Sequence, residues 1–271
     1  MTGPASSRSS VGVSGRRGTL LLVRHGQSTW VAEGRFQGRL DPPLSLLGLE
    51  QARRAGAWLA SNGGPPGLGL PTPPLEIVHS PLVRAAQTAE IIAAAIRSSS
   101  GPFTPPLRRP DARLMEVGVG AWEGLTIGEV DARWPAEHAA WRADAVGTTP
   151  PGGESLVAAA DRVRVAIPAI LDRLASPAEG PPGHAWSIVV AHGGILRLLA
   201  FALLDLPLDR FWVLPFSLAS VTVIDVDGER ASLRAHNLAE HLVGAEGGVG
   251  AEDPGDAGAK PADSGAGLRA F

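Results

Sequence analysis

The stretch Leu20-Leu21-Leu22-Val23-Arg24-His25-Gly26-Gln27-Ser28-Thr29 decides how the rest of the chain is interpreted. Four apolar residues run directly into Arg24, His25 and Gly26, a pattern that predicts a short buried strand ending at a glycine turn. In open parallel sheets, ligands bind at the carboxyl ends of such strands. A cation and an imidazole placed there suit an anionic ligand, above all a phosphate. Gly26 would let the backbone approach this anion closely.

Two further strand ends carry side chains of the same kind. A second buried strand over residues 76–80 leads into a helix that carries Arg84 in its first turn. A third strand over residues 187–191 ends at His192, which is again followed by glycine. Because the carboxyl ends of parallel strands meet at one edge of a sheet, we expect two arginines and two histidines to converge on one anion.

Helices alternate with these strands along the chain. The predicted helices cover residues 45–59, 81–96, 158–174 and 194–206, and the last two predicted strands, 220–227 and 231–235, alternate apolar and polar side chains as antiparallel edge strands do. The pattern predicts an α/β fold: a three-layer sandwich with a mainly parallel central sheet, helices on both faces and an antiparallel edge.

Composition limits the possible functions. The chain has 271 residues, of which 44% are hydrophobic, so it can bury a large core. The net charge of −3 gives no field that favours nucleic acid or an anionic membrane, and no apolar run reaches the roughly 20 residues of a membrane span. The absence of cysteine excludes disulfides, thiolate metal sites and a cysteine nucleophile. We therefore expect no nucleic-acid or membrane partner. The absence of cysteine says nothing of the compartment, and a cytoplasmic location is a separate expectation.

Both ends of the chain differ from its centre. Residues 1–17 are small, polar and arginine-containing, and we expect a disordered arm. An export signal is rejected, because the apolar run after Arg17 is needed as the first strand, whereas a transit peptide stays an alternative. Residues 244–271 are rich in glycine, alanine and aspartate and predict a disordered tail.

The convergent residues suit phosphoryl transfer. Two guanidiniums bind phosphoryl oxygens through paired donors, and their positive charge keeps a nearby His25 imidazole neutral and nucleophilic. The leaving alkoxide needs a proton, and Glu116, between an apolar pair and a glycine-rich loop, is the best candidate acid. Glu123 and Glu154 are rivals, although we favour loop-capping roles for both. No metal-binding motif, phosphate-binding P-loop or dinucleotide fingerprint is present, so no metal or cofactor is expected.

These residues resemble the histidine phosphatase superfamily, also called phosphoglycerate mutase-like. The segments that carry the resemblance are Leu22–Ser28, Gly34–Gly38 with Asp41–Ser45, Ser80–Ala89, Glu116 with Gly120–Gly124, Pro151–Ser155 and Val190–Gly194. Their order and spacing agree with the family over residues 18–243, which we take as the domain, with a cap segment at about 117–153.

The resemblance implies a function and a site. It implies a metal-independent phosphatase of small phosphorylated metabolites that forms a phosphohistidine on His25, with Glu116 as proton donor. The implied phosphate-binding residues are Arg24, Gln27, Ser28, Gln37, Gly38, Arg84, His192 and Gly193. Two positions depart from the family: Val31 and Leu218 stand where asparagine is common, and Leu218 is expected to loosen the floor of the site.

The cap segment favours hydrolysis over phosphate transfer between positions of a substrate. It is short, it has Arg133 and Arg142 as its cations, and the chain has no tyrosine, whereas the mutases carry a longer basic insertion with a tyrosine. A cofactor-dependent phosphoglycerate mutase and a catalytically silent phosphate-binding module stay as alternatives. Three tryptophans of the cap serve either packing or substrate contact: Trp122, Trp134 and Trp141. The sequence fits a monomer or a homodimer.

Overall fold

The computed structural model describes residues 17–61, 68–70, 73–99, 106–175, 185–228 and 230–244. The expected arm and tail, and with them the transit-peptide alternative, lie outside the described residues, except that Arg17 is already the first residue of a strand. Among the described helices, none is both long and apolar enough to span a membrane.

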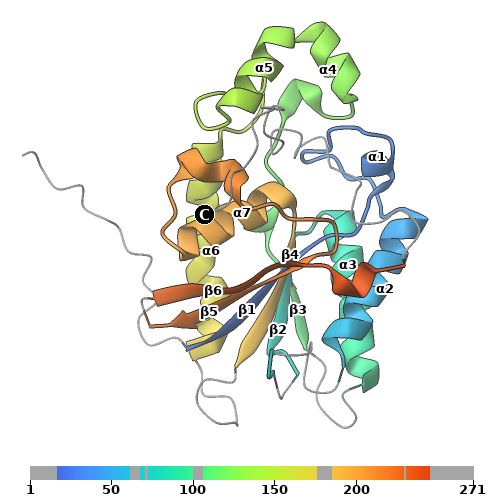
Figure 1. Ribbon diagram of the computed structural model, residues 1–271, viewed down its shortest axis with the longest axis vertical. Helices are drawn as coiled ribbons and strands as arrows, with labels where there is room; N and C mark the ends of the chain where they lie inside the picture. Colours follow the sequence, from blue (N-terminus) through green and yellow to red (C-terminus); the bar gives the residue numbers. More distant parts are fainter. Residues whose placement is uncertain are drawn as a thin grey trace, which may run out of the picture.

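A six-stranded sheet forms the centre of the molecule, in the order β3-β2-β4-β1-β5-β6 (Figure 1). Strands β1, β4, β2 and β3 are mutually parallel, β5 runs antiparallel to β1, and β6 runs antiparallel to β5. The strands are β1 (Arg17–Arg24), β2 (Glu76–His79), β3 (Leu107–Pro110), β4 (Trp186–Ala191), β5 (Val221–Asp227) and β6 (Arg230–Leu238). The expected mainly parallel sheet with an antiparallel edge is confirmed.

The register of the sheet brings three strand ends to one level. Val23 of β1 and His79 of β2 are both paired with Val190 of β4. The polar residues that follow these three positions therefore leave the sheet side by side, as the sequence predicts for a shared carboxyl edge.

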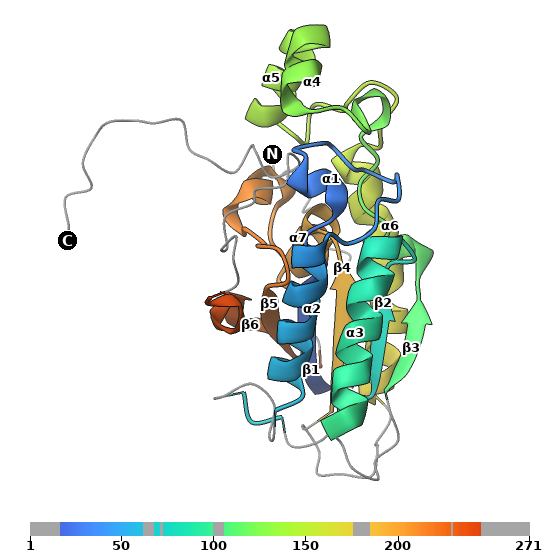
Figure 2. The same cartoon turned by 90° about the vertical axis from the view of Figure 1, so that its right-hand side faces the viewer.

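Helices cover both faces of the sheet (Figure 2). On one face lie α6 (Leu156–Ala175) and α7 (Gly193–Leu203), and on the other lie α2 (Leu46–Leu59) and α3 (Val83–Ser99). Leu20 and Leu22 belong to the core under α6 and α7, while Leu21 and Val23 belong to the core under α2 and α3. Because β1 is buried on both faces, its sequence is a continuous apolar run rather than an alternating one.

The cap segment stands beyond the carboxyl ends of the parallel strands (Figure 1). It contains α4 (Ile127–Arg133) and α5 (Pro135–Ala143), preceded by the short 3₁₀ turns η1 (Ala112–Leu114) and η2 (Gly120–Trp122). Trp122 is fully buried, and its ring lies 5.6 Å from that of Phe36, which comes from the loop after β1. The cap is therefore fixed to the domain through an aromatic core.

Some elements differ from the sequence prediction. Strand β3 was not expected, because its residues Leu-Arg-Arg-Pro are mostly exposed at a sheet edge and show no apolar alternation. The short helix α1 (Thr29–Ala32) was also missed, and α7 ends at Leu203 rather than at 206. Further 3₁₀ turns, η3 (Leu208–Val213) and η4 (Glu240–Leu242), flank the last two strands. Helix α6 continues through Pro168, as predicted.

Candidate active site

Two buried histidines lie side by side at the carboxyl edge of the sheet. His25 follows β1 and His192 follows the neighbouring β4, and their ring centroids are 5.1 Å apart with the planes inclined by 60°. Their relative exposures are 1% and 0%. The pairing predicted from two separate His-Gly sequences is thus present in the structure.

The contacts of His25 define its tautomer. Its Nδ1 lies 2.7 Å from the carbonyl oxygen of Gly26, and since a carbonyl only accepts, Nδ1 carries the hydrogen. Its Nε2 is buried and has no hydrogen-bond partner among the described residues. Burial, followed by the positive charges of Arg84 and Arg24, holds the pKa of His25 well below its usual value. A neutral ring with a lone pair on Nε2 is the form that can attack phosphorus.

Arg24 and Arg84 are both buried and held by backbone carbonyls. Arg24 donates from Nη1 to the carbonyl oxygen of Phe216. Arg84 donates to the carbonyl oxygens of Leu40 at 2.8 Å and Gly38 at 2.9 Å. These bonds fix the two guanidiniums before any ligand arrives, which lowers the entropic cost of binding an anion.

His192 lies between the end of β4 and the start of α7, where it is the N-cap residue of the helix. Its Nε2 lies 2.8 Å from the hydroxyl oxygen of Ser80, the residue that follows β2. Burial and then the charge of Arg84 hold the pKa of His192 well below its usual value. A Cβ on Gly193 would lie 3.2 Å from Cζ of Arg24, so glycine lets the guanidinium pack against the start of α7.

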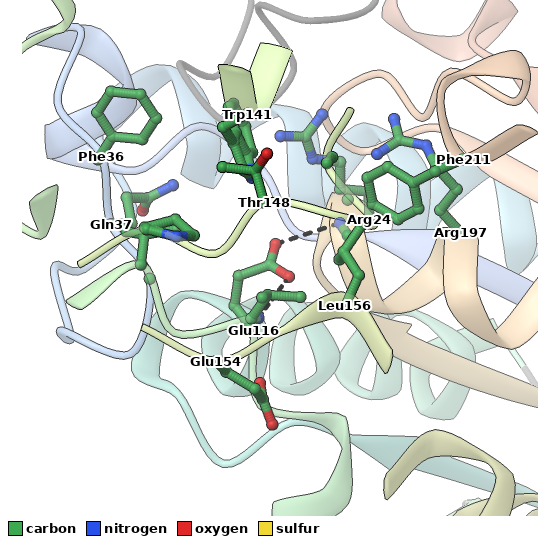
Figure 3. Close-up of a pocket in the computed structure, with 17 residues that line it drawn as sticks. Arg24, Phe36, Gln37, Glu116, Trp141, Thr148, Glu154, Leu156, Arg197 and Phe211 are labelled. Atoms are coloured by element: carbon green, nitrogen blue, oxygen red, sulfur yellow. Dashed lines mark hydrogen bonds between the residues drawn. The ribbon is translucent and has the colours of Figure 1, made fainter. Parts of the chain in front are cut away.

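Glu116 lines the cleft beside this pocket (Figure 3). Its carboxylate accepts hydrogen bonds from the backbone N–H of Val117 at 2.9 Å and of Gly194 at 3.3 Å. The second bond ties Glu116 to the first turn of α7, next to His192. The structure therefore places the expected acid at the edge of the phosphate pocket.

The two rival carboxylates make structural contacts. Glu123 accepts from the backbone N–H groups of Arg39 at 3.0 Å and Val119 at 3.2 Å, which confirms the expected loop-capping role. Glu154 also lines the cleft, but both of its oxygens accept from Arg162, at 3.0 and 2.7 Å, and Arg39 adds a further ion pair. Both carboxylates are therefore engaged in contacts that hold loops and ion pairs.

The remaining predicted residues form the support of the pocket. Gln37 and Gly38 line the cleft, and Ser28 donates its hydroxyl to the amide oxygen of Gln37 at 2.6 Å. Gln27 accepts from Ser45 at 2.8 Å and is directed toward the start of α2. Ser28 and Gln27 thus hold the loop, while Gln37 faces the cleft (Figure 3).

The cleft continues from the phosphate pocket into an apolar compartment under the cap. Trp141 is the cap tryptophan that lines it, whereas Trp122 is buried in the cap core. Sequence reasoning missed the residues that complete its walls: Phe36, Ala145, Leu156, Arg197 and Phe211. Of these, only Arg197 gave a local signal, as a lone charge in the apolar helix α7, where it now lies buried 4.8 Å from the ring of Phe211.

The described residues contain no group of three or more histidines and acids that could hold a metal ion. His184, one of the scattered histidines, lies outside them. Positive charge in the pocket comes instead from Arg24 and Arg84. The residues present fit an anion site rather than a dication site.

Comparisons with known proteins agree with this geometry. The model of the histidine phosphatase superfamily (branch 1) matches residues 20–239. Glucosyl-3-phosphoglycerate phosphatase of Mycolicibacterium vanbaalenii is 41% identical over 197 residues, covering 72% of this chain and 78% of that protein. Phosphoserine phosphatase 1 of Hydrogenobacter thermophilus is 30% identical over 227 residues, covering 82% and 93%. A structure of mycobacterial glucosyl-3-phosphoglycerate phosphatase with VO3 matches with a TM-score of 0.68 at 33% identity, covering 82% and 99%. The chain belongs to the histidine phosphatase superfamily.

Proposed function

We propose that the protein hydrolyses small phosphate monoesters through a phosphohistidine formed on His25. The observation that carries the proposal is the pair of buried histidines flanked by Arg24 and Arg84, with Glu116 on the wall of the same cleft. The two relatives described above are named as phosphatases of a phosphoglycerate derivative and of phosphoserine, and these names support hydrolysis over the mutase alternative.

The first step transfers the phosphoryl group to the enzyme. Arg24 and Arg84 bind the phosphoryl oxygens, and the lone pair on Nε2 of His25 attacks phosphorus. The P–N bond forms as the P–O bond to the leaving group breaks. Glu116, protonated at this stage, gives its proton to the leaving oxygen, so that an alcohol departs rather than an alkoxide.

The second step returns the enzyme to its starting state. Water enters beside Glu116, which is now a carboxylate and removes a proton as the water oxygen attacks phosphorus. The P–N bond breaks, its electron pair returns to Nε2, and inorganic phosphate leaves. Glu116 is again protonated, so no external acid or base is consumed.

The apolar compartment receives the leaving group. The cleft has a cavity volume of about 60 Å³. Trp141, Phe36, Thr148 and Glu154 are among the residues that line it (Figure 3). Side chains of the cap thus determine which alcohols the enzyme releases fastest.

The test measures release of inorganic phosphate from a panel of phosphomonoesters by the wild type and by two variants. One variant is His25→Ala. The other, His236→Asn, is a matched control, because His236 lies on β6 and does not line the cleft. Wild type and control should turn over, and His25→Ala should lose all turnover while keeping its circular dichroism spectrum. Quenching the reaction of labelled substrate with alkaline detergent should trap a base-stable, acid-labile phosphoenzyme in the wild type and none in His25→Ala. Turnover by His25→Ala would refute the proposal.

Two expectations from the sequence stay with this proposal. The protein is expected to be cytoplasmic, which fractionation of cells expressing the full chain would check. It is expected to be a monomer or a homodimer, which sedimentation equilibrium would distinguish.

A further inference from the structure

Ser80 occupies a fixed position between two of the strand ends that form the pocket. It directly follows β2, is fully buried, and donates its backbone N–H to the carbonyl oxygen of Val190 on β4 at 3.0 Å. Its hydroxyl therefore has little freedom. The hydroxyl oxygen has two contacts: it accepts from the backbone N–H of Leu82 at 3.3 Å, and it lies 2.8 Å from Nε2 of His192.

The hydrogen in the bond between Ser80 and His192 belongs to one side or the other. If Nε2 carried it, the serine oxygen would accept twice, and its own hydrogen would have no acceptor among the described residues. A buried donor without a partner costs about 1–3 kcal/mol. If Ser80 donates to Nε2 instead, the serine hydrogen is used, and Nδ1 of His192 is then the one group of this pair without a partner among the described residues. The hydrogen balance therefore favours donation by Ser80.

Donation by Ser80 decides where the hydrogen of His192 sits. Burial and the neighbouring arginines lower the pKa of this ring, so it is neutral and carries one N–H. With Nε2 as the acceptor, that hydrogen is on Nδ1. The two ring nitrogens point in diverging directions, so Nδ1 is aimed away from Ser80; it is buried and has no partner among the described residues.

We propose that Ser80 is a positioning residue that holds His192 in its Nδ1–H tautomer, so that an uncharged imidazole donates a hydrogen bond to the phosphoryl group. In the opposite tautomer, a lone pair would face the phosphoryl oxygens and repel them. The inference about the tautomer stands on the hydrogen bonds and the burial of His192, and its catalytic consequence rests on the proposed function.

The tautomer is read directly by nitrogen-15 NMR of the full chain labelled at histidine. The variants are Ser80→Ala, Ser80→Thr and Ser187→Ala; Ser187 is an equally buried serine on β4 whose hydroxyl lacks a partner in the described structure. His192 should show a protonated Nδ1 and a bare Nε2 in the wild type and in Ser187→Ala. Ser80→Ala should lose this state, because no hydroxyl then donates a hydrogen bond to Nε2 of His192. Ser80→Thr should keep it, because threonine retains the hydroxyl. A protonated Nε2 in the wild type would overturn the proposal.

Binding of inorganic phosphate supplies the second measurement. Losing a hydrogen bond to a charged group weakens binding by roughly tenfold to a hundredfold, so the dissociation constant of phosphate should rise by that factor in Ser80→Ala and return toward the wild-type value in Ser80→Thr. It should not change in Ser187→Ala. An unchanged dissociation constant in Ser80→Ala would overturn the proposal. Absence of turnover in the wild type, with the expected NMR signals and phosphate binding, would instead refute the proposed function and leave the tautomer established.

Discussion

The two buried histidines make the stability of the fold depend on pH. His25 and His192 are neutral in the folded protein because their pKa values lie well below the ordinary value. In the unfolded chain, both rings bind a proton near pH 6.5. As the pH falls below this value, the unfolded state takes up protons that the folded state does not, so the free energy of unfolding decreases.

The size of this effect follows from linkage. Between pH 7 and pH 5.5, a ring that titrates at about 6.5 when unfolded and stays neutral when folded removes about 1.3 kcal/mol, and two rings remove about 2.5 kcal/mol. Replacing His25 by asparagine, which keeps a donor for the Gly26 carbonyl, removes one titrating group. Replacing His192 by glutamine removes the other. Each single variant should recover about 1.3 kcal/mol of the loss seen in the wild type.

Urea unfolding at the two pH values measures this difference. His79, His236 and His241, whose pKa values are also lowered, remain in all four proteins, so their contribution cancels in the comparison. The same cancellation applies to the carboxylates. The double variant should lose about 2.5 kcal/mol less than the wild type over this interval. An identical loss in both proteins would refute the assignment of buried, neutral rings.

Three further predictions concern the reaction itself. Glu116→Gln should lower kcat on alkyl phosphates by about 100-fold to 10,000-fold and much less on p-nitrophenyl phosphate, whose leaving group needs no proton; equal losses would contradict the acid role. Trp141→Ala should change the ranking of esters in a substrate panel, whereas Trp134→Phe, at a cap position outside the cleft lining, should preserve it. Activity should survive EDTA, because Arg24 and Arg84 supply the positive charge; a loss that zinc or magnesium reverses would contradict this.

Sequence reasoning succeeded where the signal is local. Strands β1 and β4 are buried on both faces, so each contains a run of four apolar residues that can be recognised without its partners, and β2 is buried along its whole length. Strand β3 could not be recognised, because it pairs through its backbone while its side chains face solvent. The convergence of His25 and His192 followed from the parallel edge alone, and the register of the sheet bears it out.

Two features could not be predicted because they depend on contacts between distant segments: which residues line the cleft, and why position 26 requires glycine. Trp141 and Phe211 are separated by 70 positions in the numbering and meet only in the folded cleft, so no local pattern selected them from the other aromatic residues. Gly26 was expected to let an anion approach. In the structure, a Cβ at this position would lie 2.5 Å from the carbonyl oxygen of Gly48, so packing against α2 by itself requires the glycine.

Residues 216–220 form a loop that contacts His25, and this loop contains Leu218, one of the two departures from the family pattern. Leu218 was expected to weaken the floor of the site, yet its side chain is buried and the loop is held by other groups. Arg24 donates to the carbonyl oxygen of Phe216, and the backbone N–H of Ala219 donates to the carbonyl oxygen of His25 at 3.2 Å. Asn237 of β6 accepts from the N–H of Ser217 at 2.7 Å. None of these bonds uses the side chain at 218, so the loop has anchors that do not depend on the residue at this position, and the effect of Leu218 on the site stays a prediction.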